Sequence, residues 1–254
     1  MRTMTAKKFL RNIFLTSCSF VFCSVAFAGQ IRNPVVLFVG PTNKQMDVSE
    51  SNPVGTPQIS ADLKGLTASG EFEFKRRYFG LVSIISANGV AAATNPISWN
   101  NFGVSMGIGR IVQTHWFQNW HKSIELTYTQ IGSPFLTTDP TGNLIFQTAT
   151  LKKLAFEVTG SYYLTDRLTT MLGLGLLYGR LYSSKMNGTP GVIGGLLRLQ
   201  LTFQLSSRFF ALGEISGEHE TYSYSSLNQQ SGKPMSSSSV QNVTNATAGI
   251  GYVF

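Results

Sequence analysis

Apolar side chains occupy every second position over much of the chain. In Lys152–Leu164, the residues Leu154, Phe156 and Val158 lie on one side of an extended chain, whereas a helix would scatter them around its axis. Gly194–Leu205 repeats the pattern, with leucine or phenylalanine at alternate positions from 197 onward. The alternation therefore predicts β-strands that have one apolar face.

Eight runs of this kind follow one another along the chain. They are Gly70–Ser86, Asn101–Gln113, His121–Ile131, Thr150–Leu164, Leu168–Ser183, Gly191–Leu205, Arg208–Tyr224 and Val240–Phe254. Most exceed the five or six residues of an ordinary globular strand. A strand that crosses a bilayer at a tilt needs about 9–11 residues. The lengths predict strands that span a membrane.

Short and long connections alternate between the runs. The short ones are Thr114–Trp120, Thr165–Arg167 and Ser206–Ser207, and the long ones are Ala87–Trp99, Gly132–Ala149, Ser184–Pro190 and Ser225–Ser239. Outer-membrane barrels alternate in this way, with short periplasmic turns and longer external loops. An even number of strands would also return the chain to the periplasmic side.

Membrane-spanning strands must pair all their backbone polar groups, which only a closed barrel achieves. The sequence therefore predicts an all-β fold, an eight-stranded antiparallel transmembrane β-barrel over residues 66–254. Aromatic residues near the short connections predict a girdle at the membrane boundary. Its members are Trp116, Trp120, Tyr162 and Phe209. The alternative is a soluble β-sandwich with these rings in its core.

The N-terminus predicts a secretory signal peptide over residues 1–28, cleaved near Ala28. Basic residues precede the apolar run Ile13–Val25, and small residues follow it. A membrane anchor is the alternative, but the run is too short to span a bilayer as a helix. Leu15–Cys18 also resembles a lipoprotein cleavage box. The expected location is the outer membrane of a Gram-negative bacterium.

Residues 29–65 do not show the strand pattern and are expected to form a periplasmic extension or plug. They contain one short apolar run, Val35–Val39, followed by a stretch of linker composition. The segment could be a plug strand, an additional strand, a docking peptide or a disordered leader.

Charge and cysteine content narrow the chemistry. Cys18 and Cys23 both leave with the signal peptide, so no thiol chemistry or disulfide is expected in the mature chain. The formal net charge of +8 includes four basic residues of the signal peptide. No basic stripe remains, so nucleic-acid binding is not expected. His115 and His121 lack a nearby carboxylate, and neither a metal nor a cofactor is predicted.

Charged residues on the alternate faces are expected to line the barrel interior. The predicted lumenal polar network comprises Glu73, Lys75, Glu125, Lys153, Glu157, Arg198 and Glu214, with Glu71 and Glu218 as further candidates. An eight-stranded barrel is just wide enough for its side chains to fill it. An ion-paired core is therefore the first interpretation, and a narrow path that prefers cations is the second.

The end of the chain resembles the C-terminal signature of bacterial outer-membrane β-barrel proteins. Gly249, Tyr252 and Phe254 match the signature, while Ala248 stands where it has a polar residue. The resemblance implies that these three residues form an assembly signal for the barrel-assembly machinery. With the predicted strand number, the chain resembles the small barrels: the OmpA transmembrane domain and the OmpX, OmpW and opacity-type proteins.

Three classes of function remain open. The first is a structural or surface-interaction barrel whose external loops meet lipopolysaccharide, host molecules or other cells. The second is a small pore or apolar-solute channel. The third is a lipid A hydrolase, for which only His219, Ser223 and Glu218 or Glu220 can be nominated. The first class is preferred, and the chain is not expected to be an enzyme.

Overall fold

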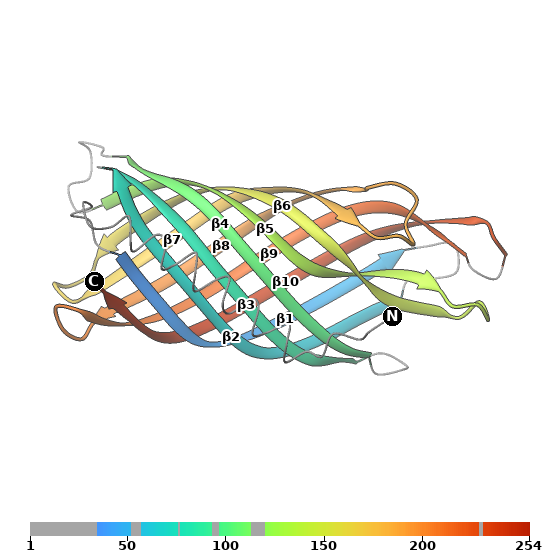
Figure 1. Ribbon diagram of the computed structural model, residues 1–254, viewed down its shortest axis with the longest axis horizontal. Coiled ribbons are helices and arrows are strands. Elements are labelled where there is room, and N and C mark those ends of the chain that lie inside the picture. Colours follow the sequence, from blue (N-terminus) through green and yellow to red (C-terminus); the bar gives the residue numbers. More distant parts are fainter. Residues whose placement is uncertain (1–34, 52–56, 76, 93–96, 113–119, 229–230) are drawn as a thin grey trace, which may run out of the picture. The chain divides into compact units, whose positions relative to one another are not determined.

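The computed structural model describes residues 35–254 apart from 52–56, 76, 93–96, 113–119 and 229–230. The described strands form a single closed antiparallel barrel (Figure 1). They are β1 (Val35–Ser51), β2 (Gln58–Lys75), β3 (Tyr78–Ala92), β4 (Ile97–Val112), β5 (Trp120–Thr138), β6 (Leu144–Tyr163), β7 (Leu168–Tyr182), β8 (Gly191–Gln204), β9 (Phe209–Leu227) and β10 (Pro234–Val253). Each pairs with its neighbours in sequence, and β1 pairs with β10.

The predicted all-β fold, a closed antiparallel β-barrel, is confirmed, but the predicted number of eight strands is wrong. One additional strand comes from the run Gly70–Ser86, which is two strands. Lys75 of β2 pairs with Tyr78 of β3, and the register shifts between Glu73 and Lys75. Arg77 has a positive φ of 78°. The sequence pattern does not indicate this turn, because residues 75–78 include no glycine, proline or asparagine.

The other additional strand is β1, so the expected extension over residues 29–65 is wrong for the part of it that the structure describes. Val35–Ser51 pairs along its length with both β2 and β10, and residues 58–65 belong to β2. The outward face of β1 changes from apolar at Val39 to polar at Asn43 and Gln45. The polar half of β1 therefore has the composition of a linker, although it is a strand. The predicted signal peptide lies outside the described residues.

β1 and β10 close the barrel along its whole length. The backbone N–H of Phe254 donates to the carbonyl oxygen of Val35 (3.0 Å). Farther along, Gly40 and Gly249 let the two backbones approach closely, because a Cβ at either would collide with the opposite strand. This closure leaves neither terminal strand as an edge. No helix in the described part of the chain is long and apolar enough to cross a membrane.

The two ends of the barrel differ. We call the end with Val35 and Val253 the terminal end, and the end with Ser51 and Pro234 the far end. Much of two predicted external loops is strand: of Gly132–Ala149 only residues 139–143 lie between β5 and β6, and Ser225–Ser239 contains the end of β9 and the start of β10. Ser184–Pro190 is a connection, as predicted, between β7 and β8. Strands thus extend well beyond the length that a bilayer requires.

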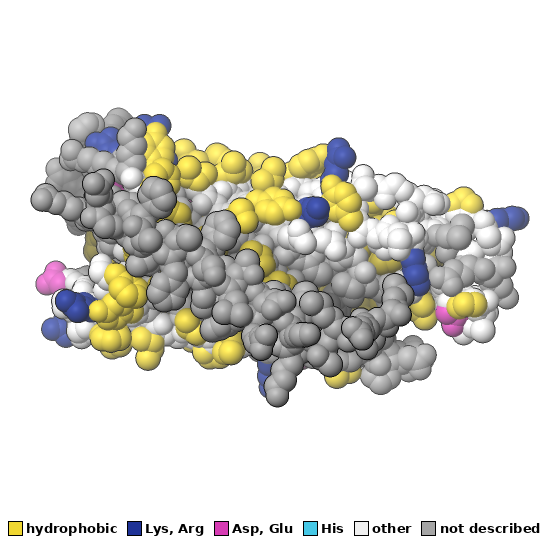
Figure 2. Space-filling model, viewed as in Figure 1, with side chains coloured by type: hydrophobic (Ala, Val, Ile, Leu, Met, Phe, Trp, Pro, Cys, Tyr) yellow, Lys and Arg dark blue, Asp and Glu magenta, His cyan; other side chains and the backbone are white. Residues whose placement is uncertain are grey.

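The outer wall carries an apolar belt, part of which is seen in Figure 2. Leu154, Phe156 and Val158 are 45–48% exposed on it, whereas Lys153 and Glu157, at alternate positions of the same strand, are buried inside. Toward the far end, the outward positions become polar. This first polar row, which we call the collar, includes Asn43, Lys64, Asn88, Gln130, Lys152 and Arg180. The belt marks the membrane-spanning part of the wall.

Candidate functional site

A cluster of ion pairs lies inside the part of the barrel surrounded by the belt. The Arg198 guanidinium on β8 donates from Nε to Glu157 Oε1 on β6 and from Nη2 to Glu125 Oε2 on β5, both at 2.8 Å. Alternation along each strand points these side chains inward. The two bonds hold three strands at one level of the lumen, and a buried charge requires such partners.

A second group of charged side chains lies nearer the far end than the Arg198 cluster. Lys153 on β6 is 6% exposed and forms ion pairs across the lumen with Glu218 and, at 2.8 Å, with Glu220 on β9. Lys44 on β1 donates to Asn101 Oδ1 (3.0 Å) on β4. These contacts cross the interior from wall to wall.

The remaining predicted lumenal residues lie closer to the terminal end. Glu214 faces the interior, and Glu73 accepts a hydrogen bond from the Arg77 backbone nitrogen (3.2 Å). The side chain of Lys75 lies outside the described part. The sequence analysis missed Lys44 and Asn101. Lys44 lay in the supposed extension, although the alternation of β1 could have revealed its inward position.

The lumen contains a polar chamber of about 620 Å³. Five carboxylates and two cations face it: Glu71, Glu125, Glu157, Glu214, Glu218, Lys153 and Arg198. Its lining also includes Asp166, Arg167 and Arg208 in the short turns, so the chamber opens at the terminal end. Among the described residues, neither Glu71 nor Glu214 has a cation within ion-pair distance. The formal charge of the side chains that line the chamber is therefore negative.

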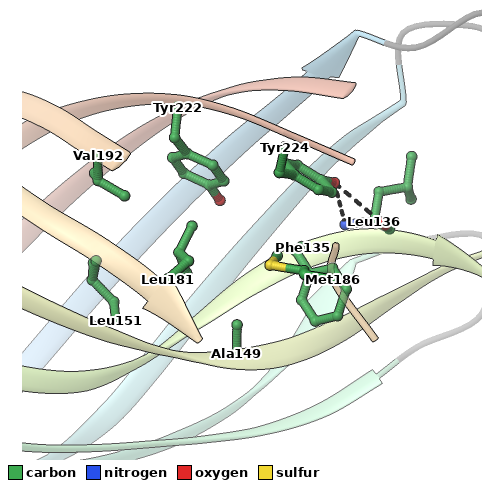
Figure 3. Close-up of a cluster of buried hydrophobic side chains, with 9 residues drawn as sticks. All are labelled: Phe135, Leu136, Ala149, Leu151, Leu181, Met186, Val192, Tyr222 and Tyr224. Carbon is green, nitrogen blue, oxygen red and sulfur yellow. Dashed lines mark hydrogen bonds between the residues drawn. The ribbon is translucent and has the colours of Figure 1, made fainter. Parts of the chain in front are cut away.

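Apolar side chains fill the lumen between the chamber and the far end. One cluster comprises Met46, Val48, Ile59, Ala61, Leu63, Ala87 and Val243. A second comprises Phe135, Leu136, Ala149, Leu151, Leu181, Met186, Val192, Tyr222 and Tyr224 (Figure 3). Phe146 packs against both. The described lumen is therefore open at one end and filled at the other.

Part of the apolar cluster in the lumen comes from a hairpin that leaves the barrel wall. β4 pairs with β5 only as far as Gly103 and Ile131, and β7 pairs with β6 only from Tyr182 and Thr150 onward. Residues 132–149, which we call the cap, pair only with each other within the described ladders. In Figure 1 this yellow-green hairpin bends across the far end of the barrel.

Side chains of the opposite wall fasten the cap. The Tyr222 hydroxyl on β9 donates to the Pro134 carbonyl (2.8 Å). The Tyr224 hydroxyl accepts from the Leu136 backbone nitrogen (2.7 Å) and donates to the Leu136 carbonyl (3.1 Å), as Figure 3 shows. Where β5 leaves the wall, Asn101 Nδ2 donates to the Gly132 carbonyl (2.8 Å). Side chains thus replace the backbone partners that the cap has lost.

A buried carboxyl group lies beneath this attachment. Glu50 on β1 is 1% exposed, and its Oε2 lies within hydrogen-bonding distance of the Tyr224 hydroxyl (3.0 Å). It lies beyond the belt, because Ser49 and Ser51 are the outward residues at its level. Burial raises the pKa of Glu50 to about 7. Burial also raises the pKa of the Tyr222 and Tyr224 hydroxyls, which remain protonated near neutral pH.

The predicted assembly residues and girdle lie at the terminal end. The Tyr252 ring packs edge-on against Phe254 (4.7 Å between centroids) and Phe209 (5.0 Å). Gly249 lies in the β1–β10 contact. Tyr162 pairs with Trp120 across β5 and β6, although the Trp120 side chain is outside the described part. Trp116 lies in an undescribed segment.

The residues nominated for hydrolysis are not brought together. His219 is exposed on the outer wall, where its Nδ1 lies 2.7 Å from Asn242 Oδ1. Ser223 is also exposed, whereas Glu220 on the same strand is buried in the lumen. Within the described residues, no group of three or more histidine, cysteine or carboxylate side chains is arranged to hold a metal ion.

A comparison with one known protein supports the fold. The outer-membrane protease OmpT from Escherichia coli superposes with a TM-score of 0.51 at 11% identity, covering 89% of this chain and 98% of that one. The translocator domain of the autotransporter NalP from Neisseria meningitidis gives 0.46 at 11% identity, covering all of both chains. OprG from Pseudomonas aeruginosa gives 0.43 at 11%, covering 87% and 96%. No sequence family and no curated sequence matches the chain.

Proposed function

We propose that this chain is a surface protein of the Gram-negative outer membrane, with a closed barrel whose collar binds lipopolysaccharide. The fold is shared with outer-membrane barrel proteins. The filled far half of the lumen favours a structural or surface-interaction role over a permanently open pore. The separation of His219 from the inward carboxylates gives a hydrolase no support.

A pair of cations on the collar is the main support for a lipopolysaccharide partner. Lys152 on β6 and Arg180 on β7 are directly opposite each other and exposed on the outer wall. Like charges at such positions repel. No carboxylate among the described residues forms an ion pair with either one. An anion between them would remove the repulsion.

The location of this pair fits a lipid phosphate. Leu154 and Tyr178, which follow on the same strands toward the terminal end, are exposed in the belt. The Lys152 ammonium lies over the Tyr182 ring, 4.9 Å from its centroid. The cations thus lie where apolar wall meets polar surface, at headgroup level. Lipid A phosphates in the outer leaflet supply the matching negative charge.

The test is lipopolysaccharide binding by the double variant Lys152→Gln/Arg180→Gln. Each basic residue near an anionic membrane contributes about 1 kcal/mol, so affinity should fall about 30-fold. Lys185→Gln, in the exposed β7–β8 connection, is the matched control and should bind normally. Unchanged binding by the double variant would refute the site. Equal binding to phosphatidylglycerol vesicles or free phosphate would identify a general anion site instead.

The assembly partner is proposed on separate grounds. Tyr252 and Phe254 form an aromatic group at the terminal end, beside the contact that closes the barrel. In this proposal the barrel-assembly machinery recognises that group before closure. Host or cell-surface ligands would meet the strand walls beyond the collar, since the described connections there are short.

A further inference from the structure

We propose that the cap is a gate, and that its release joins the chamber to the far end and opens a path for cations. This activity goes beyond the surface role, which requires only the closed barrel.

The cap can move without breaking the strand pairing of the barrel wall. Gly132 and Thr150 are register partners at its base, and from there the two strands pair only with each other within the described ladders. Swinging the hairpin outward therefore breaks none of the described ladders of the barrel. An isolated two-stranded hairpin is marginally stable, so its closed position depends on contacts with the opposite wall.

Glu50 and Tyr224 form a latch that depends on one proton. Tyr224 has a single hydroxyl hydrogen but lies within bonding distance of two acceptors, Glu50 Oε2 (3.0 Å) and the Leu136 carbonyl (3.1 Å). A neutral Glu50 can donate its own proton to Tyr224, which leaves the tyrosine hydrogen for Leu136. A charged Glu50 competes for that hydrogen and weakens the hold on the cap.

The surroundings of Glu50 make it the titrating group of the latch. From β9 it faces Tyr222 and Tyr224, and Glu220 lies farther along that strand beside Lys153. Its register partner on β10 is Ser239, and its backbone nitrogen donates to the carbonyl oxygen of Pro57, the residue before β2. The cap carries Asp139 at its exposed tip. None of the described side chains within ion-pair distance of Glu50 is a cation.

The direction of the pH dependence follows from the pKa of Glu50. In the closed barrel burial raises it to about 7, whereas a solvated carboxyl has 4.5. The closed state therefore holds the proton more tightly, and closure is most favourable below pH 4.5. It weakens as the pH rises toward about 7, by a factor on the order of a hundred in the closed-to-open ratio.

Two features define the open state. Phe135 and Leu136 are fully buried when the cap is closed, so exposing them disfavours opening, and openings should be brief at any pH. The open path would pass the carboxylates of the chamber and then Glu220. Carboxylate-lined pores favour cations. We therefore expect rare, cation-selective events that become more frequent at higher pH.

The experiment records single channels in planar bilayers from refolded protein lacking residues 1–28, at about pH 5 and about pH 8. Wild type should open on the order of a hundredfold more often at the higher pH. Glu50→Gln keeps the carboxyl neutral and should open rarely at both. Equal opening frequencies in wild type at the two pH values, or an unchanged pH response in Glu50→Gln, would overturn the latch.

A second variant tests the gate independently of titration. Replacing Ser133–Ala149 by Asn-Gly joins the register partners Gly132 and Thr150 by a two-residue turn. This capless barrel should conduct steadily at both pH values, with a reversal potential that indicates cations. A folded, heat-modifiable capless barrel that stays silent would show that the wall alone closes the lumen, and would overturn the gate.

Discussion

The Tyr224 hydroxyl lies 2.7 Å from the Leu136 backbone nitrogen and 3.1 Å from the Leu136 carbonyl oxygen, although 88 residues separate them. One side chain thus satisfies both polar groups of a buried peptide segment that has left its sheet. Backbone groups buried without partners destabilise a fold.

Tyr224→Phe should therefore loosen the cap. Removing the hydroxyl leaves the Leu136 N–H and C=O without this partner, at a cost of about 1–3 kcal/mol. Hydrogen exchange should accelerate across residues 132–149 and remain slow in the barrel wall. Ser223→Ala, on the outward side of the same strand, is the control. Uniform acceleration throughout the barrel would contradict a role confined to the cap.

Arg198 should be essential for the ion-pair cluster in the lumen. Arg198→Met leaves Glu125 and Glu157 buried without their counter-charge, so the free energy of unfolding should fall by about 3–5 kcal/mol. Adding Glu157→Gln should recover part of the loss. Arg208→Met, at the exposed mouth, should have little effect. Denaturant unfolding in vesicles measures all three, and an equal loss at Arg208 would refute the assignment.

The two faces of β8 should respond differently to the same substitution. Leu199→Arg places a charge on the apolar belt and should cost about 2–4 kcal/mol. Gln200→Arg points into the chamber, opposite Glu214 in the register, and should cost less. Equilibrium folding into lipid vesicles gives both values. If the two costs were equal, the belt would be misplaced.

The turn at the tip of the cap should loosen in acid. Asp139 accepts hydrogen bonds from the Thr141 hydroxyl (2.7 Å) and from the backbone nitrogens of Thr141 and Asn143, and these bonds lower its pKa below 3.8. Because the pKa is lowered, the stabilisation is present above 3.8 and is lost as the pH falls through the lowered value. The amide resonances of Thr141 and Asn143 should report the transition. Asp139→Asn should abolish it.

The terminal aromatic group should govern assembly in cells. Deleting Phe254 removes the ring that packs against Tyr252 and a hydrogen bond to Val35, so folded protein in the outer-membrane fraction should fall sharply. Phe203→Ala, on the belt, tests whether any exposed ring has the same effect. Normal levels of the Phe254 deletion variant would count against an assembly signal.

The sequence pattern was most informative in the belt, where residues that face lipid are apolar and alternate residues that face the lumen are polar. The faces of β6 and β8 agree with the prediction, since Leu154 and Leu199 are exposed on the belt and Glu157 and Arg198 lie inside. Beyond the collar that contrast disappears. Ser236 and Ser238 face outward while Ser237 and Ser239 face inward, so a strand there has the composition of a loop.

The cap could not be inferred from local patterning. Phe135 and Leu136 are adjacent residues on opposite faces of β5, and both are buried. Such a pair conflicts with alternation, and the glycine, proline and asparagine residues of Gly132–Ala149 predict a loop. What buries the second face is Tyr224, a residue distant in the chain. Only the closure of the barrel brings it into contact.

The terminal strands of the barrel wall have no free edge, because β1 pairs with β10, but the cap has two. Along residues 132–138 and 144–149, each strand has one side that pairs with no strand in the described ladders. While the cap lies in the lumen, those edges are sheltered. Outside it, they would offer hydrogen-bonding groups to any extended chain nearby, including the cap of a second molecule. The fold thus holds a hairpin with unpaired backbone groups inside the barrel, where it cannot pair with neighbouring molecules and cause aggregation.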